Sequence, residues 1–205
     1  MEASFCPFGT AWIDYDNDGR LDLLAVNGAV TLIETLVLAG DPYPLHQPNQ
    51  LFHNEGGGRL REVPTAEAGA AFTLSEVSRG AAFGDIDNDG DTDVVIANNN
   101  GPVRLLLNQH GAANSWLGLR LVDRHGRDAV GARVRVERKD GSVLWRRVRM
   151  DGSYAAANDP RLLVGLAGVS EPVGVQVHWP GGAREHWPAV APGAYRVLRE
   201  GEGAP

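Results

Sequence analysis

One internal repeat limits what this chain can fold into more than any other feature of its sequence. Residues 9–24 align without a gap on residues 80–95, and each copy contains the turn motif Asp-x-Asp-Asn-Asp-Gly. Short apolar runs separated by Gly and Asn clusters surround both turns, a pattern typical of strands joined by turns. The first half of the chain is therefore predicted to be all-β and to consist of two similar units, at about 8–65 and 79–110.

Acidic side chains occupy the first, third, fifth and ninth positions of each turn. They are Asp14, Asp16, Asp18 and Asp22 in the first copy and Asp85, Asp87, Asp89 and Asp93 in the second. Carboxylates two residues apart on a tight turn can direct their oxygens toward one point, and the glycine at the sixth position supplies a backbone angle that other residues resist. At the seventh position, Arg20 and Asp91 are expected to contribute main-chain carbonyl oxygens.

An all-oxygen ligand set of this kind predicts two Ca²⁺ sites. Flexible coordination by several carboxylates suits calcium, whereas the lack of sulfur and imidazole disfavours zinc and copper. An EF-hand would place Glu at the twelfth position, but Ala25 and Ile96 stand there. A plain Asn-Asp-Gly hairpin turn with incidental acids is the alternative, and four fixed acidic positions in two copies favour metal. Without metal, mutual repulsion of the acids should loosen each turn.

A short helix is predicted inside the first unit. In residues 30–38, Leu32, Ile33, Leu36 and Val37 fall at helical spacing. From residue 114 the repeat ends, and six short alternating or apolar runs follow, at residues 117–122, 132–136, 143–148, 162–166, 173–179 and 195–198. Their spacing predicts a small sandwich or barrel over residues 114–205, after a first domain over residues 1–113.

The net charge of −7 is unevenly distributed. The first 113 residues hold 5 basic and 16 acidic residues, whereas the remaining 92 hold 14 basic and 10 acidic residues. Arginines of the second half alternate with apolar residues, as on the solvent-exposed face of strands, so no nucleic-acid partner is expected. No apolar run is long enough to cross a bilayer, so no membrane span is expected.

Several polar and aromatic groups in the second half leave alternatives open. The histidines His178 and His186 flank a Pro-Gly-Gly turn, and an exposed cross-strand pair is favoured over a metal site there. A polar loop that could bind a ligand, or only cap its own backbone, comprises Ser153, Tyr154, Asn158, Asp159 and Arg161. The tryptophans that could form a sugar-binding platform are Trp145, Trp179 and Trp187, although Trp179 shares strand spacing with core valines.

Both halves resemble known families. The repeats resemble the FG-GAP or VCBS repeats of integrin-alpha-like β-propellers, and the segments that carry this resemblance are residues 8–19, 49–54 and 79–85. The second half resembles the ASPIC/UnbV domain through residues 114–118, 131–134, 153–154, 158–161 and 175–180. This order is similar to that of the cartilage acidic protein and UnbV-like family.

The resemblance implies two four-stranded blades of a partial β-propeller, stabilised by Ca²⁺ and followed by a small β domain. It also implies an extracellular or periplasmic location and no enzymatic activity, and no catalytic motif is found in the sequence. Two blades cannot close a ring, so missing blades or another chain are expected to cover the open sheet edges. The chain is also expected to be a piece of a longer protein.

The function predicted from the sequence is therefore a non-enzymatic calcium-binding interaction or scaffold module, with an unidentified protein or glycan partner. One alternative is a carbohydrate-binding module that uses the C-terminal tryptophans. Another is an accessory protein or enzyme of secondary-metabolite biosynthesis, an analogy at the level of the family alone.

Overall fold

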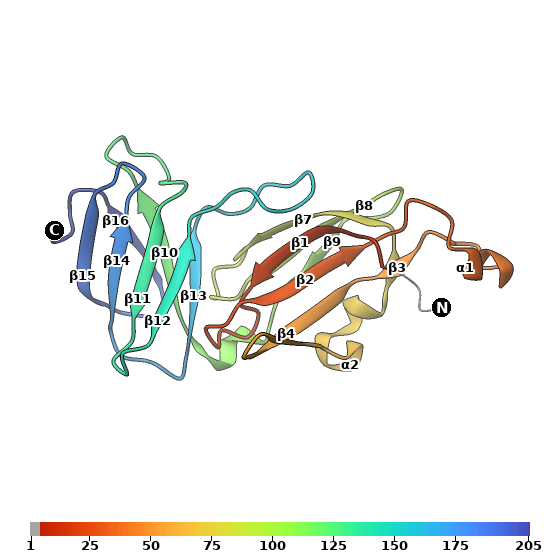
Figure 1. Cartoon of the computed structure of the whole chain (residues 1–205), viewed down its shortest axis with the longest axis horizontal. Helices are drawn as coiled ribbons and strands as arrows, with labels where there is room; N and C mark the ends of the chain where they lie inside the picture. Colours follow the sequence, from red (N-terminus) through yellow and green to blue (C-terminus); the bar gives the residue numbers. More distant parts are fainter. Residues whose placement is uncertain (1–4) are drawn as a thin grey trace.

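The computed structural model describes residues 5–205, so residues 1–4 of the expected first domain lie outside the described residues. Most of the regular secondary structure of the described chain is β-strand, which confirms the predicted fold class. Two stacked blades form one end of the molecule and a sandwich forms the other (Figure 1).

The first blade is a four-stranded antiparallel sheet in the order β1-β2-β4-β5. Its strands are β1 (Pro7–Ile13), β2 (Asp22–Asn27), β4 (Gln50–Gly56) and β5 (Arg59–Glu62). The predicted helix is present as α1 (Glu34–Leu38), between β2 and β4. None of its residues is buried, because the helix lies beyond the end of the sheet (Figure 1).

The second blade has only three strands within the described chain. The prediction of a fourth strand in this blade was wrong. The strands are β7 (Ser78–Gly84), β8 (Asp93–Asn98) and β9 (Arg104–Leu106). After β9 the chain forms the short 3-10 helix η2 (Gly111–Ala113) and then enters the sandwich. The segment between the blades contains α2 (Thr65–Ala68), η1 (Ala70–Thr73) and a two-stranded ladder of β3 (Gln47–Pro48) and β6 (Ser75–Glu76).

One apolar core joins the two blades. It is formed by Ile13, Leu24, Val26, Leu51, Val63, Phe72, Ala81, Phe83, Val94 and Ile96. The first strands of the two blades, β1 and β7, approach closely, and a Cβ on Gly9 would lie 2.8 Å from the main-chain nitrogen of Ala81. Gly9 therefore allows the backbones of the two blades to meet, whereas a Cβ on the equivalent Gly80 would lie 3.0 Å from the main-chain oxygen of Tyr154.

The C-terminal half is a seven-stranded sandwich, and no closed barrel forms within residues 5–205. One sheet has the order β13-β10-β16 and the other β12-β11-β14-β15. The strands are β10 (Ser115–Val122), β11 (Arg133–Glu137), β12 (Val143–Arg147), β13 (Leu162–Ala167), β14 (Val173–His178), β15 (Arg184–Val190) and β16 (Tyr195–Arg199). Six correspond to the predicted runs, and β15 was not predicted.

Strand alternation produces the core of the sandwich. Val134, Val136, Val175 and Val177 are completely buried, while the intervening residues of β11 and β14 face outward. Each such valine contributes about 1.5–3 kcal/mol relative to an exposed one. Within the described residues, no helix is long and apolar enough to span a membrane.

Candidate metal centre

Each turn motif joins the first two strands of its blade. Loop 1 (residues 14–22) connects β1 to β2, and loop 2 (residues 85–93) connects β7 to β8. Gly19 and Gly90 have φ angles of 95° and 97°, and Asn17 and Asn88 have φ angles of 57° and 62°. Glycine adopts this left-handed region freely and asparagine more readily than most residues, which explains the Asn-x-Gly spacing common to both loops.

The acids of loop 1 lie close together. One ligand oxygen from each of Asp14, Asp16 and Asp18 lies within 4.8 Å of the other two. A second group in the same loop consists of Asp16, Asp22 and the imidazole of His53. His53, on β4, was not predicted as a site residue, and its ring nitrogen Nδ1 lies 3.3 Å from Asp22 Oδ1.

Loop 2 gathers a related but different set. Oxygens of Asp85, Asp87 and Asp93 lie within 4.8 Å of one another. Asp89 lies outside this group, and its Oδ1 accepts a hydrogen bond of 3.0 Å from the main-chain nitrogen of Asp91. Leu107 stands where His53 stands in the first repeat, so loop 2 has no imidazole beside its acids.

The ninth-position aspartates close both loops in the same way. Asp22 accepts hydrogen bonds from the main-chain nitrogens of Tyr15 (3.2 Å) and Asn54 (2.7 Å). Asp93 accepts equivalent bonds of 2.8 Å from Ile86 and Asn108. Each aspartate therefore ties the start of its loop to the end of the blade's third strand. The Asn shared by the aligned segments Leu-Phe-His-Asn (51–54) and Leu-Leu-Leu-Asn (105–108) was a visible signal for this contact.

The seventh-position side chains differ between the loops. The guanidinium of Arg20 pairs with Asp18, and its Nε donates to the main-chain oxygen of Asn54 at 2.7 Å. The side chain of Asp91 is completely buried and accepts a hydrogen bond of 3.2 Å from Asn17 of loop 1. Asp91 thus links the two loops and is not part of the acidic group of its own loop.

Arginine side chains form ion pairs with the acids of loop 1, whereas at loop 2 Arg161 donates to the main-chain oxygen of Asp85 and to Asn88. Arg146 of β12 forms an ion pair of 3.1 Å with Asp14, and both side chains are at least nine-tenths buried. Together with Arg20, it places two guanidinium groups on the carboxylates of loop 1. Across the described part of the chain, no arginine forms an ion pair with a carboxylate of loop 2. The hydroxyl of Tyr195 instead donates to Asp85 Oδ2 at 2.9 Å.

Burial and mutual repulsion disfavour the charged form of these acids. Burial raises the pKa of Asp22 to about 6, and the nearby Asp16 carboxylate adds to this effect. Burial also raises the pKa of Asp14 and of Asp91 to about 6, and it raises the pKa of Asp93. Convergent acids that are costly to ionise fit a hard divalent cation, because a cation at their centre would offset both effects.

Both loops also form the contact between the blades and the sandwich. A Cβ on Gly165 of β13 would lie 2.5 Å from both Asp14 Oδ2 and the backbone of Asn17. A Cβ on Gly90 would lie 1.9 Å from the ring of Trp116 on β10. The sandwich therefore rests directly on the backbones of the two loops. We call this contact the seam.

The polar loop predicted in the second half binds the blade in addition to its own backbone. Ser153 Oγ accepts a hydrogen bond from Ala81, Asn158 Oδ1 accepts one from Phe83, and Asp159 donates its main-chain N–H to Phe83. Residues 149–161 thus cover the free edge of β7 and extend over the blades (Figure 1). Arg161 donates to the main-chain oxygen of Asp85 at 2.7 Å, at the start of loop 2.

The structure separates the tryptophans of the predicted platform. Trp179 is 3% exposed and belongs to the core, and Trp187 packs against the same core. Trp145 is 49% exposed on β12. A platform of all three is therefore wrong, because strand alternation points Trp179 inward. The histidines are not paired directly, since His178 stands opposite Arg184 and His186 opposite Gln176.

Comparison with protein families agrees with this architecture. Residues 14–96 match the model of the FG-GAP-like repeat, and residues 122–205 match that of the ASPIC and UnbV domain. The two matched segments follow one another in the expected order, which confirms the resemblance found in the sequence.

Among individual proteins, the chain is similar to cartilage acidic protein 1 of Mus musculus and of Homo sapiens. The identities are 43% and 42% over 60 residues. The aligned segment is 29% of this chain and 9% of the length of each relative, so the chain corresponds to only a small part of those proteins.

Proposed function

We propose that loop 1 and loop 2 each bind one Ca²⁺ and that the chain acts as a non-enzymatic, calcium-stabilised interaction module. The observation that carries this proposal is the convergence of three carboxylates within 4.8 Å in each loop. Calcium would supply positive charge to acids whose ionisation is otherwise costly. The ligands would be Asp14, Asp16, Asp18, Asp22 and the Arg20 carbonyl in loop 1, and Asp85, Asp87, Asp89, Asp93 and the Asp91 carbonyl in loop 2.

The seam gives calcium a role beyond the loops themselves. Asp14 contacts Arg146 of β12, and Asp85 contacts Tyr195 of β16. Ordering of the loops would therefore fix how the sandwich sits on the blades, and with it the surface that both present to a partner. This is a structural use of the metal, in which binding free energy becomes folding free energy.

Calcium removal tests the proposal. Thermal unfolding followed by circular dichroism should show a substantially lower Tm in EGTA than in millimolar calcium. At a hundredfold excess over Kd, one site alone stabilises the fold by about 2.7 kcal/mol. Asp16→Asn and Asp87→Asn should each reduce the calcium effect, and Asp41→Asn, in an acid outside both loops, is the matched control. An identical Tm in EGTA and calcium would contradict the proposal.

The location and the lack of activity are parts of the same proposal. The name of the two relatives refers to cartilage, and together with the family match it supports an extracellular or periplasmic location. The family match likewise supports an interaction role in preference to an enzymatic one. The biosynthetic accessory role has no specific observation in its favour.

A further inference from the structure

The outward face of the sheet β12-β11-β14-β15 carries an unusual row of basic side chains. In the strand register, Arg147 stands opposite Arg133, Arg133 opposite His178, and His178 opposite Arg184. The row crosses all four strands, which lie side by side in Figure 1, and at about 4.8 Å per strand it extends over roughly 14 Å. We call these four residues the basic row.

The charge of the basic row is only weakly compensated, through Asp151, whose pKa is lowered mainly by Arg149 and to a smaller extent by Arg147. Within the described residues, Arg133, Arg147 and Arg184 form no ion pair, and all three are exposed. Like charges directly opposite each other destabilise a sheet, so the Arg133–Arg147 pair is an unfavourable choice for stability alone. Burial lowers the pKa of His178, and the positive charges of the nearby Arg184, Arg133 and Arg135 lower it further.

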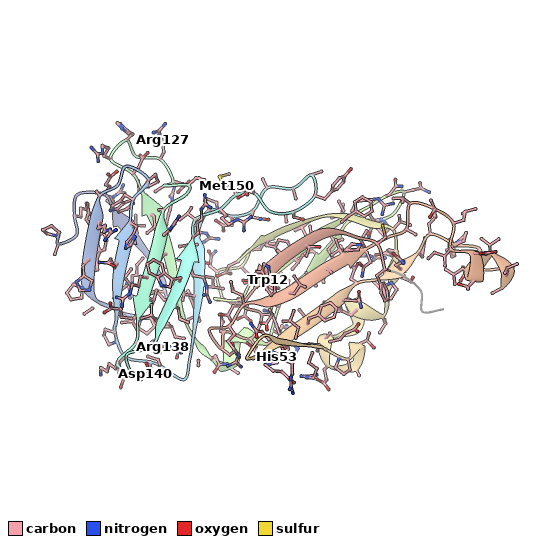
Figure 2. The ribbon with its side chains drawn as sticks, viewed as in Figure 1. Trp12, His53, Arg127, Arg138, Asp140 and Met150 are labelled. Carbon is pink, nitrogen blue, oxygen red and sulfur yellow. The ribbon has the colours of Figure 1, made fainter. Side chains whose placement is uncertain are left out.

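An exposed aromatic ring lies next to the basic row. Trp145 stands opposite Arg135 in the neighbouring row, and its ring meets the His178 ring edge-on at 5.4 Å. The same end of the face opens into a cleft of about 890 Å³ between sandwich and blades, lined by Arg133, Trp145 and Arg147. Trp12, 54% exposed on β1, lines the cleft from the blade side and points into the region beside the sandwich (Figure 2).

We propose that the basic row, Trp145 and Trp12 bind an acidic polysaccharide. Guanidinium groups pair with carboxylates and sulfates in a planar, bidentate manner, and an exposed indole offers a flat apolar surface to a sugar ring. A linear chain that carries a negative charge on successive sugars would match the three guanidinium groups of the row, which are spaced by the strands. The inference gives the proposed interaction module a ligand class, but it does not depend on calcium in the loops.

Two features favour a polysaccharide over other polyanions. The row lies on a sheet face whose central strands are already paired on both edges, so recognition must use side chains and not the main-chain pairing that an extended peptide offers. The net charge of −7 opposes a polymer as densely charged as nucleic acid. Three arginines beside an indole suit a more dilute anion.

Binding to chondroitin sulfate and to dermatan sulfate oligosaccharides, which carry about one negative charge per sugar, tests the proposal. The full chain, with calcium held constant at a saturating concentration, should bind both in titrations followed by tryptophan fluorescence, and should not bind neutral dextran. Arg133→Gln combined with Arg147→Gln should weaken binding at least about tenfold. Trp145→Ala should weaken it several-fold. Arg127→Gln combined with Arg199→Gln removes the same charge elsewhere on the sandwich and should leave binding unchanged.

Three results would overturn the inference. They are no binding to either acidic polysaccharide, equal losses in the two double variants, and tighter binding of single-stranded DNA or poly-glutamate than of the polysaccharides. All variants lie outside both loops, and each should keep the Tm difference between calcium and EGTA. Loss of polysaccharide binding alone would therefore not affect the calcium proposal. Equal Tm values in calcium and EGTA would likewise not affect the polysaccharide proposal.

Discussion

At the scale of single residues, the two loops share a motif but not an environment. In loop 1, Asp14 and Asp18 already have arginine partners, and a divalent cation would compete with those guanidinium groups. In loop 2, the carboxylates of Asp85, Asp87 and Asp93 have hydrogen-bond donors but no arginine within ion-pair distance. The loops are therefore not expected to bind metal with equal affinity.

We expect loop 2 to bind calcium more tightly than loop 1, because Arg161, the guanidinium nearest to loop 2, is ion-paired with Asp159 and not with a carboxylate of the loop. Isothermal titration of the wild-type chain should resolve two affinities, and Asp87→Asn should abolish the tighter one. Arg20→Gln should then tighten loop 1 by about fivefold, the effect of removing one partly exposed ion pair. Arg59→Gln, an exposed charge on the same blade, is the control. If Asp16→Asn, and not Asp87→Asn, abolished the tighter of the two affinities, the tighter site would be loop 1 and the assignment would be reversed.

At the scale of elements, the seam depends on backbones that touch without side chains between them. Strand β13 reaches loop 1 at Gly165, and Ala167 donates its main-chain N–H to the carbonyl of Asn17 at 2.9 Å. A side chain at Gly165 has no space, since the nearest atoms belong to the loop backbone and to a buried carboxylate. The strand and the loop therefore fit only while this position has no Cβ.

Gly165→Ala should destabilise the chain by about 1–3 kcal/mol in urea unfolding, the usual cost of forcing extra atoms into a closed contact. Gly168→Ala, three residues further along, is the matched control because a Cβ at that position would have no neighbouring atom within 4 Å. The Gly165 variant should also lower calcium affinity, since the clash falls on Asp14. Equal free energies of unfolding for the two variants would show that the seam tolerates an added methyl group, which would contradict this prediction.

Local pattern predicted most elements, and long-range contacts account for what it missed. The inner strands of both blades and six of the sandwich strands follow from apolar runs between turns, whereas β5 is a short, exposed and mostly charged strand. β15 was missed because Pro188 and the charged residues at its start hide the strand pattern. In the site, the acidic positions were visible in the motif, but Arg146 lies 132 residues from its partner Asp14. Such pairings form only when the blades and the sandwich meet at the seam, and a short stretch of sequence does not contain both partners.

At the scale of the whole molecule, the raised pKa values connect stability to pH. Asp22 and Asp91 ionise with a pKa of about 6 in the folded chain, against 3.8 in the unfolded chain. Between these values the folded state holds protons that the unfolded state has released. Folding therefore becomes more favourable as pH falls through this window, as long as no cation occupies the loops.

In EGTA, the Tm should accordingly rise when the pH is lowered from 7.5 to about 5. In calcium the trend should reverse, because protons compete with the metal for the same carboxylates. Differential scanning calorimetry at both pH values, with and without calcium, measures the four combinations. Asp91→Asn should flatten the trend in EGTA. A Tm in EGTA that falls steadily with acidification would contradict the assignment of these buried acids.

The first and last strands of the sandwich are neighbours. β10 and β16 run parallel, with Gly118 opposite Tyr195, so their sheet needs a segment from each end of the sandwich sequence. During synthesis, both blades leave the ribosome before β16 does, and the sandwich cannot close until β16 has been synthesised. The residue that starts this final strand is also the one that donates to Asp85. The pairing of β16 with β10 is thus the step that fixes the second turn in place.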